Sequence, residues 1–298
     1  MKKWAYISAI ALLAGCVDVE DYFLSTGQVS VPGQYTFEYY GTNELLVDEE
    51  MFFGENEYSL LTLETVDDQG NPATTYALYF GDPATMDQDT VIVYCHGNGV
   101  TLESAFRRAT AMANVGGKGR FGVLAVEYVG FGLADGDISE ENMYLGTQAA
   151  IDWAEGQGLT EDRMYFYGVS LGSAASVGLT AAPRTLRPEK LMLEVPLASI
   201  ATLSQDVLGV VLDISFLSQD NALDNIGKMP TIDQPLLLMH GAEDGYIDYE
   251  SNGRALYEAY QGESGTLVVV EGAGHGNTPE TMGWELYEQT VLDFILER

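Results

Sequence analysis

The sequence predicts an α/β protein with a mostly parallel central sheet, antiparallel strands on its N-terminal side and helices on both faces. Three observations point to this class. Short apolar runs alternate with helical stretches from residue 90 onward, which is typical of parallel strands joined by crossover helices. Before residue 90, apolar and polar residues alternate, as in antiparallel strands. Hydrophobic residues make up 46% of the 298 positions, which is enough for a sizeable core.

The predicted strands fall into two groups. Three alternating runs, at residues 35–40, 58–66 and 75–80, predict antiparallel strands. Residues 68–72, DQGNP, predict the turn between the last two, because Gly, Asn and Pro favour turns. The later runs are almost continuously apolar, as in strands that are buried on both faces. They span residues 90–95, 122–128, 163–167, 190–195, 235–239 and 266–270.

Helical patterns lie between these strands, most clearly over residues 140–157 and 251–260. An amphipathic pattern over 281–298 predicts a C-terminal helix that closes the domain. The interval at about 197–233 is too short for a full cap domain. We expect it to form a short lid of one or two helices that line an acyl pocket, and plain core packing is the alternative.

The N-terminus resembles the leader of a bacterial lipoprotein. Lys2 and Lys3 precede a short apolar stretch that ends in Leu-Ala-Gly-Cys, a sequence similar to a lipobox. The resemblance implies removal of residues 1–15 as a signal peptide and lipidation of Cys16, with a palmitate-type acyl chain among its lipids. Residues 16–34 then form a lipidated tether to a domain over 35–298. We expect a membrane-anchored protein of the bacterial cell envelope, on the periplasmic side or in the outer membrane.

The charge balance is strongly acidic. The chain has 13 Lys and Arg against 45 Asp and Glu, a formal net charge of −32. Such a surface repels phosphates, so we expect no nucleic-acid partner. Solubility in a salty environment is the simplest interpretation. Residues 135–141, DGDISEE, are the best candidate for calcium binding, but they lack the glycine at position six of an EF-hand loop.

The motif Gly168-Val169-Ser170-Leu171-Gly172 matches the pattern G-x-S-x-G and predicts a nucleophile. An apolar strand precedes it and a helix rich in small residues follows. The flanking glycines permit a tight strand-to-helix turn, which presents Ser170 at the helix N-terminus. An ordinary glycine-rich turn with a serine cap is the structural alternative.

A serine nucleophile needs a base and an acid that orients the base. The chain has three histidines. His275 lies in a glycine-rich loop after the last predicted strand and is the candidate base, whereas His96 and His240 end strands and are expected to shape loops. Asp244, in the loop after strand 235–239, is the candidate acid, with Asp248 and Glu194 as rivals. No paired ligand spacing supports a metal site, and no cofactor is expected.

Two backbone donors are expected to form the oxyanion hole. Leu171 follows the nucleophile directly, and Asn98 lies in His96-Gly97-Asn98-Gly99 after strand 90–95. An ordinary turn is the alternative for this segment. The other cysteine, Cys95, lies within the apolar strand and is expected to be a buried thiol, so no intramolecular disulfide framework is possible.

Five segments in order carry a family resemblance: HGNG at 96–99, EYVGFG at 127–132, GVSLG at 168–172, HGAED at 240–244 and GAGH at 272–275. Together they resemble compact α/β-hydrolases, including membrane-associated acyl-protein thioesterases and many bacterial members, over about residues 60–298. Glu127 and Val129 depart from the family, whose members often have Asp and Arg there.

The resemblance implies an α/β-hydrolase fold and a serine hydrolase that cleaves an ester or thioester through an acyl-enzyme. Ser170, Asp244 and His275 take the order nucleophile, acid, base along the chain, which is the order in this family. The substrate is expected to be a small or acylated molecule. A serine peptidase on the same triad, and a surface lipoprotein that uses a hydrolase scaffold for binding, are the alternatives. The sequence does not predict an oligomeric state.

Overall fold

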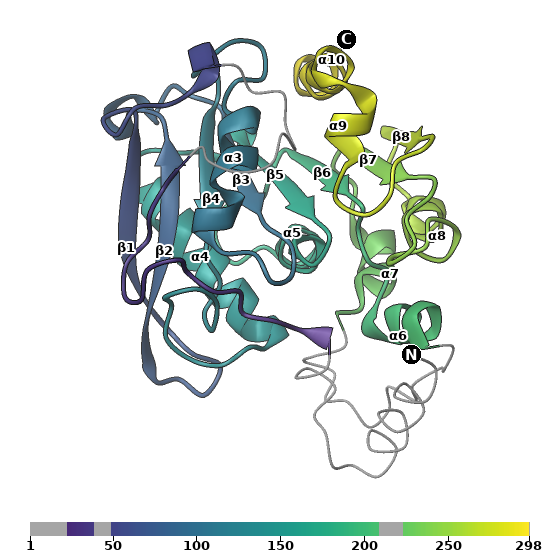
Figure 1. The fold of residues 1–298 in the computed structure, drawn as a ribbon, viewed down its shortest axis with the longest axis horizontal. Helices are drawn as coiled ribbons and strands as arrows, with labels where there is room; N and C mark the ends of the chain where they lie inside the picture. The colour runs from purple at the N-terminus through teal and green to yellow at the C-terminus, as the bar shows by residue number, and fades with distance from the viewer. Residues whose placement is uncertain (1–22, 39–48, 209–222, 298) are drawn as a thin grey trace.

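The structure is a computed structural model and describes residues 23–38, 49–208 and 223–297. Its centre is one eight-stranded sheet in the order β1-β2-β4-β3-β5-β6-β7-β8, with β1 and β8 at opposite edges (Figure 1). The strands are β1 (Tyr58–Val66), β2 (Pro72–Phe80), β3 (Val91–Cys95), β4 (Gly122–Val126), β5 (Met164–Val169), β6 (Lys190–Glu194), β7 (Leu236–Gly241) and β8 (Gly265–Val270).

The sheet is antiparallel at one edge and parallel elsewhere. β1 pairs with β2 and β2 with β4 in antiparallel register, whereas β4, β3, β5, β6, β7 and β8 run parallel. The predicted fold class is therefore confirmed. The carboxyl ends of parallel strands lie on the same side of a sheet. The loops after β3, β5, β7 and β8 therefore meet at this carboxyl end of the sheet. These four loops carry the candidate site residues.

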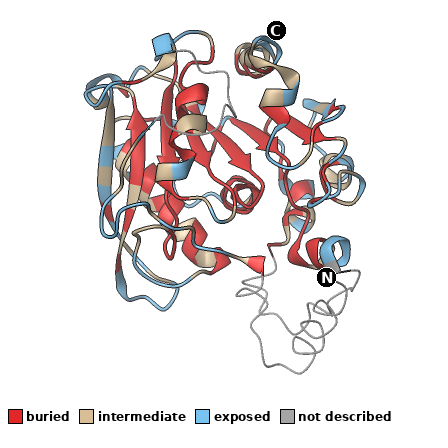
Figure 2. Ribbon diagram, in the orientation of Figure 1, coloured by how far each residue is buried: buried red, intermediate tan, exposed pale blue. Residues whose placement is uncertain are grey.

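Helices cover both faces of the sheet. They are α3 (Leu102–Met112), α4 (Glu140–Gly156), α5 (Gly172–Ala181), α6 (Ile200–Leu208), α7 (Asn225–Lys228), α8 (Ala255–Ala259), α9 (Thr278–Met282) and α10 (Trp284–Leu296). Side chains of α4, α5 and α8 share one buried apolar cluster, and those of α3 and α10 share another. The buried sheet between these layers appears as the red centre of Figure 2.

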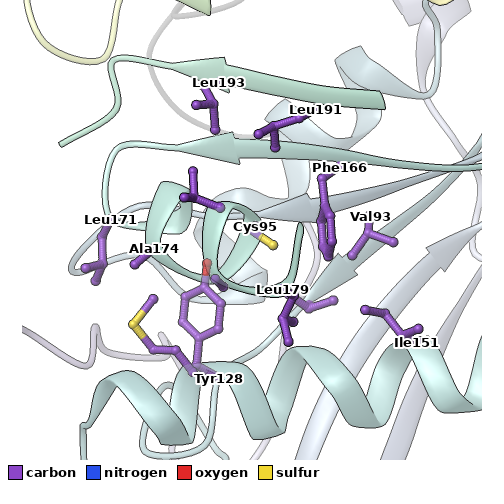
Figure 3. Packing of buried hydrophobic residues seen from close by; sticks show 14 of the residues in the cluster. Val93, Cys95, Tyr128, Ile151, Phe166, Leu171, Ala174, Leu179, Leu191 and Leu193 are labelled. Atoms are coloured by element: carbon purple, nitrogen blue, oxygen red, sulfur yellow. The ribbon is translucent and has the colours of Figure 1, made fainter. Parts of the chain in front are cut away.

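Alternate residues of the inner strands enter the two clusters. In β3, Val93 and Cys95 face the α4–α5 side, whereas Ile92 and Tyr94 face the α3–α10 side. This alternation follows from the two-residue period of a strand. Figure 3 shows the α4–α5 side, where Leu171 at the start of α5 and Tyr128 of the loop after β4 belong to the same buried apolar cluster. Cys95 is a buried free thiol, and burial raises its pKa. The beginning of α5 is thus anchored in the core.

Three predicted elements differ from the structure. The strand expected over 35–40 does not form in residues 35–38, where the Tyr35 hydroxyl donates to Glu127 and the Phe37 ring packs on Phe106. The alternating apolar residues of this segment therefore pack against the domain from a loop and not from a strand. The C-terminal helix begins at Trp284 and not at 281, because Gly283 has φ 79° and separates it from α9.

The helix expected over 251–260 is split. A π-helical turn, η7 (Glu250–Arg254), precedes α8. Within η7, Gly253 approaches the ring of His240 so closely that a Cβ would overlap the imidazole. Within the predicted lid, α6 and α7 are described, and its residues 209–222 lie outside the described ranges.

The predicted tether is described from residue 23 onward. Phe23 is buried, and the backbone of Ser25 is hydrogen-bonded to the loop after β3. This part of the predicted tether therefore lies against the domain. Cys16 and residues 1–15 lie outside the described ranges. No helix in the described part of the chain combines the length and the apolar composition that a membrane span requires.

Candidate active site

Ser170 lies in the sharp turn between β5 and α5. Its backbone has φ 51°, a left-handed conformation that costs a residue with a side chain about 1–3 kcal/mol. The two motif glycines make the turn possible, because a Cβ on Gly172 would overlap the Cys95 carbonyl and one on Gly168 would overlap the Ser176 hydroxyl. Ser170 N–H donates to the Glu194 carbonyl at 2.9 Å, which fixes the turn against β6.

The structure brings Ser170, His275 and Asp244 together. The Oγ of Ser170 lies 3.2 Å from Nε2 of His275. On the other side of the imidazole, Nδ1 lies 2.8 Å from Oδ2 of Asp244. With Nδ1 donating to the carboxylate, Nε2 is left as an acceptor for the serine hydroxyl. The arrangement can therefore remove a proton from Ser170.

Asp244 is held as an acceptor from two directions. Its Oδ1 accepts the backbone N–H groups of Tyr246 and Ile247, both at 2.9 Å. Burial raises the pKa of this carboxyl, but hydrogen bonds from His275 and the two N–H groups outweigh burial and hold the pKa below its ordinary value. Asp244 is consequently ionised at neutral pH, and its negative charge lies beside the His275 ring.

The rival acids are engaged elsewhere. Asp248 accepts the N–H of Ser251 at 3.1 Å. The buried Glu194 pairs with Arg108 at 2.7 Å and accepts the Tyr167 hydroxyl at 2.6 Å. Among the contacts of the described residues, His275 Nδ1 is paired with Asp244 alone. The geometry favours Asp244 as the orienting acid.

The two expected oxyanion donors flank the nucleophile. Leu171 begins the turn into α5, and Asn98 lies on the loop after β3 beside Ser170. Within the described residues, neither backbone N–H has an acceptor. The Asn98 side chain is used differently, since its Nδ2 donates to the Phe23 carbonyl and its Oδ1 accepts the Ser25 N–H, both at 2.7 Å.

The other two histidines are buried and shape loops. Both ring nitrogens of His96 face acceptors, the Glu127 carboxylate at 2.8 Å and the Gly97 carbonyl at 3.0 Å. His240 Nε2 donates to the Ile247 carbonyl at 3.0 Å, and burial lowers the His240 pKa. Each histidine fixes a loop that carries a candidate site residue, Asn98 in one case and Asp244 in the other.

Two pockets flank Ser170. The larger, about 410 Å³, is lined by His275, Arg108, Tyr94 and Tyr246 among others. The smaller pocket is narrow and apolar, with about 20 Å³ of free space. We call it the apolar slot. Its apolar walls come from the N-terminal segment, the start of α5, the loop after β6, α6, the start of the segment that leads to α7, and the loop after β7: Phe23, Leu24, Leu171, Leu197, Ile200, Leu203, Leu223, Tyr246 and Ile247.

Arg108 is a site residue that the sequence did not reveal. From α3 it donates to Glu194 at 2.7 Å and to the carbonyl of Gly276, the neighbour of His275, at 2.6 Å. Burial alone would lower the Arg108 pKa, but the charges of Glu194 and Glu280 raise it, so the guanidinium stays charged. Arg108 thus ties the loop of His275 to the end of β6. No motif marks it, because its partners are far away in the sequence.

The candidate calcium segment has structural roles. Asp135 accepts the Thr74 N–H, Ser139 caps α4, and Glu140 pairs with Lys228. In the described part of the chain, no group of three or more His, Cys, Asp or Glu side chains is arranged to hold a metal ion. The acidic side chains of this segment therefore support helix α4 and its neighbours.

The chain is similar to known proteins in sequence and in fold. No model of a known protein family matches the sequence. Alpha/beta hydrolase domain-containing protein 17B of Xenopus laevis is 31% identical over 199 residues, which cover 66% of this chain and 62% of that protein. The human protein 17B is 30% identical over the same coverage. The chain thus spans less than two thirds of these relatives' length.

The solved structures with this fold include esterases. The Pyrococcus furiosus esterase Pf2001 has a TM-score of 0.63 at 13% identity, over 80% of this chain and 91% of that one. Est1E of Butyrivibrio proteoclasticus, solved with ferulic acid, has a TM-score of 0.60 at 20% identity, over 78% and 98%. At these identities the likeness shows the fold. With the sequence relatives, it places the chain in the α/β-hydrolase superfamily.

Proposed function

We propose that this protein is a serine hydrolase that cleaves a carboxylic ester or thioester. The observation that carries the proposal is the continuous contact from Ser170 Oγ through His275 to Asp244, beside a pocket large enough for a small molecule. The strained, glycine-flanked turn at Ser170 supports the same role, because strain of this kind gathers at functional sites. The esterases among the solved neighbours also support it.

The reaction follows from the geometry in two steps. His275 Nε2 takes the proton of Ser170 as Oγ attacks the carbonyl carbon, and then gives that proton to the leaving oxygen or sulfur. The products of this step are an acyl-serine and a free alcohol or thiol. Water next attacks the acyl-serine with His275 again as base, which releases the acid and restores the serine hydroxyl. Asp244 stabilises the imidazolium in both steps.

The backbone N–H groups of Asn98 and Leu171 are the proposed donors to the oxyanion. Each lies on a loop or helix start that the core fixes, so no reorganisation is needed as charge develops. The loop of Asn98 is held by His96 and Glu127, and Leu171 is buried in the apolar core. In enzymes with such a site, loss of one oxyanion donor costs about 2.7–4 kcal/mol of transition-state stabilisation.

The reaction class is tested by hydrolysis of p-nitrophenyl acetate by the wild type and by Ser170→Ala. We expect activity in the wild type and loss of at least 10³-fold in the variant, with an unchanged circular dichroism spectrum. Wild-type activity in Ser170→Ala would contradict the assignment of Ser170 as the nucleophile. A parallel series of acyl thioesters and peptide amides assigns the bond, and preference for the amides would favour a peptidase.

We further propose that lipids on Cys16 anchor the enzyme to a membrane of the bacterial cell envelope. Six residues separate Cys16 from the docked Phe23, and this length of chain reaches at most about 25 Å. Phe23 is a wall of the apolar slot. The anchor therefore keeps the site within that distance of the bilayer surface. Metabolic labelling with an alkynyl fatty acid in a bacterial host should mark the wild type and not Cys16→Ala, and equal labelling would contradict the anchor.

A further inference from the structure

The two pockets beside Ser170 hold different parts of an ester in the proposed reaction. His275 must give a proton to the leaving group, so the leaving group lies on the side of His275. His275 lines the larger pocket and does not line the apolar slot. Leu171, one of the proposed oxyanion donors, lines only the slot, whereas Asn98, the other donor, lines both pockets. The acyl group, which diverges from the leaving group at the carbonyl carbon, is therefore directed into the slot.

We infer that the enzyme removes short acyl groups from large leaving groups, and that Phe23 sets the limit on acyl length. This inference rests on the proposed function. The slot offers about 20 Å³ of free space, and a cavity needs roughly 10–15 Å³ measured in this way to hold one water molecule. A methyl-sized group fits, whereas a longer chain does not. The larger pocket, about 410 Å³, lies in the range that holds drug-sized molecules.

The wall that closes the slot comes from the N-terminal segment. Phe23 is 5% exposed and lines the slot together with Leu24. The segment is fixed to the loop after β3 by three hydrogen bonds: Asn98 Nδ2 to the Phe23 carbonyl, Ser25 N–H to Asn98 Oδ1, and Gly99 N–H to the Ser25 carbonyl at 3.0 Å. The Asn98 residue that supplies the proposed oxyanion donor therefore also holds the wall in place.

Leu203 of α6 forms part of the slot from a different element. It is 5% exposed, as Phe23 is. Shortening either side chain to alanine removes apolar atoms from the slot without touching Ser170, His275 or Asp244. A Phe→Ala change in a packed wall opens space on the order of 100 Å³, enough for several methylene groups.

The experiment measures kcat/KM for p-nitrophenyl acetate, butyrate and octanoate. We expect the wild type to prefer acetate over octanoate by at least about 100-fold, because a longer acyl chain has to displace the packed side chains that line the slot. Phe23→Ala should lower this ratio by at least 10-fold. Leu203→Ala should shift the ratio in the same direction while leaving the N-terminal segment intact.

Phe53→Ala is the matched control. Phe53 has nearly the same exposure, 6%, but packs against Phe80 in the other apolar cluster and does not line the slot. Its replacement should lower stability and leave the ratio of acetate to octanoate unchanged. A change of ratio in Phe53→Ala equal to that in Phe23→Ala would attribute the effect to general loosening and overturn the inference.

Two other results would overturn the inference: a wild type that hydrolyses octanoate as fast as acetate, or folded Phe23→Ala and Leu203→Ala variants that both keep the wild-type ratio. Failure of the proposed function has a different signature. In that case Ser170→Ala would hydrolyse acetate at the wild-type rate, whatever the chain-length profile. The Ser170→Ala measurement therefore separates the two failures.

Discussion

His275 Nδ1 lies 2.8 Å from Asp244 Oδ2, and the second oxygen of the same carboxylate accepts two backbone N–H groups. The carboxylate is thus fixed before it meets the imidazole. Because the backbone fixes the carboxylate, and the carboxylate holds Nδ1, the orientation of the His275 ring depends on Asp244. This orientation leaves the opposite ring nitrogen facing Ser170.

Asp244→Asn tests this dependence. An amide can donate to Nδ1 and favour the wrong tautomer, so we expect kcat to fall by about 10³- to 10⁴-fold with little change in KM. Asp248→Asn is the control, because Asp248 lies on the same loop but contacts Ser251. Steady-state kinetics on an ester checks both variants. A larger loss in Asp248→Asn than in Asp244→Asn would reverse the assignment.

The strained backbone at Ser170 is expected to lower the free energy of unfolding of the protein. Glycine accepts φ 51° without a steric cost, whereas alanine keeps the Cβ. Ser170→Gly should therefore be more stable than Ser170→Ala by about 0.5–1 kcal/mol. At an ordinary helix position the order is the opposite, because glycine is there less stable than alanine by about the same amount. Both variants should be inactive. Urea unfolding measures the difference, and a less stable glycine variant would show that the turn is not strained.

Arg108 is expected to support His275 through the loop and not through contact with substrate. Arg108→Met leaves the buried Glu194 without its cation, which should cost about 3–5 kcal/mol of unfolding free energy. The Gly276 carbonyl loses its donor as well, and we expect kcat to fall by about 10- to 100-fold. Adding Glu194→Gln should recover stability but not kcat. Recovery of both would assign Arg108 a purely electrostatic role.

The lowered pKa of His240 predicts that the free energy of unfolding depends on pH. Burial lowers its pKa in the folded state below the ordinary value of about 6.5. Below pH 6.5 the unfolded chain binds a proton that the folded protein does not, so stability falls as pH decreases. The slope from this one group reaches at most about 1.4 kcal/mol per pH unit. His240→Gln should reduce the slope between pH 6.5 and 5, and an unchanged slope in urea titrations would contradict the lowered pKa.

The fold was predictable wherever the pattern was local. The buried parallel strands appeared as apolar runs, and Ser170, Asp244 and His275 follow three of these strands at the edge where parallel strands end together. The alternating run at 35–38 was misleading, because Tyr35 bonds to Glu127 in a loop and not to a strand. Side-chain hydrogen bonds of this kind have no sequence period.

Two residues of the site could not be predicted. Arg108 meets Glu194 across 86 positions, and Phe23 meets Asn98 across 75. Each contact depends on which helices and loops the sheet order brings together, and no motif surrounds either residue. The predicted tether had an unremarkable sequence, yet Phe23 and Leu24 of this segment line the apolar slot beside Ser170. Only the three-dimensional arrangement reveals this role.

The most direct test of the central claim is covalent labelling with a fluorophosphonate, followed by intact-mass measurement and peptide mapping. A fluorophosphonate reacts with a serine that a neighbouring base has activated. We predict one adduct per chain, located on Ser170, with labelling lost in Ser170→Ala and strongly slowed in Asp244→Asn. Absence of an adduct in folded wild-type protein, or an adduct on another residue that persists in Ser170→Ala, would contradict the proposal that Ser170 is the nucleophile.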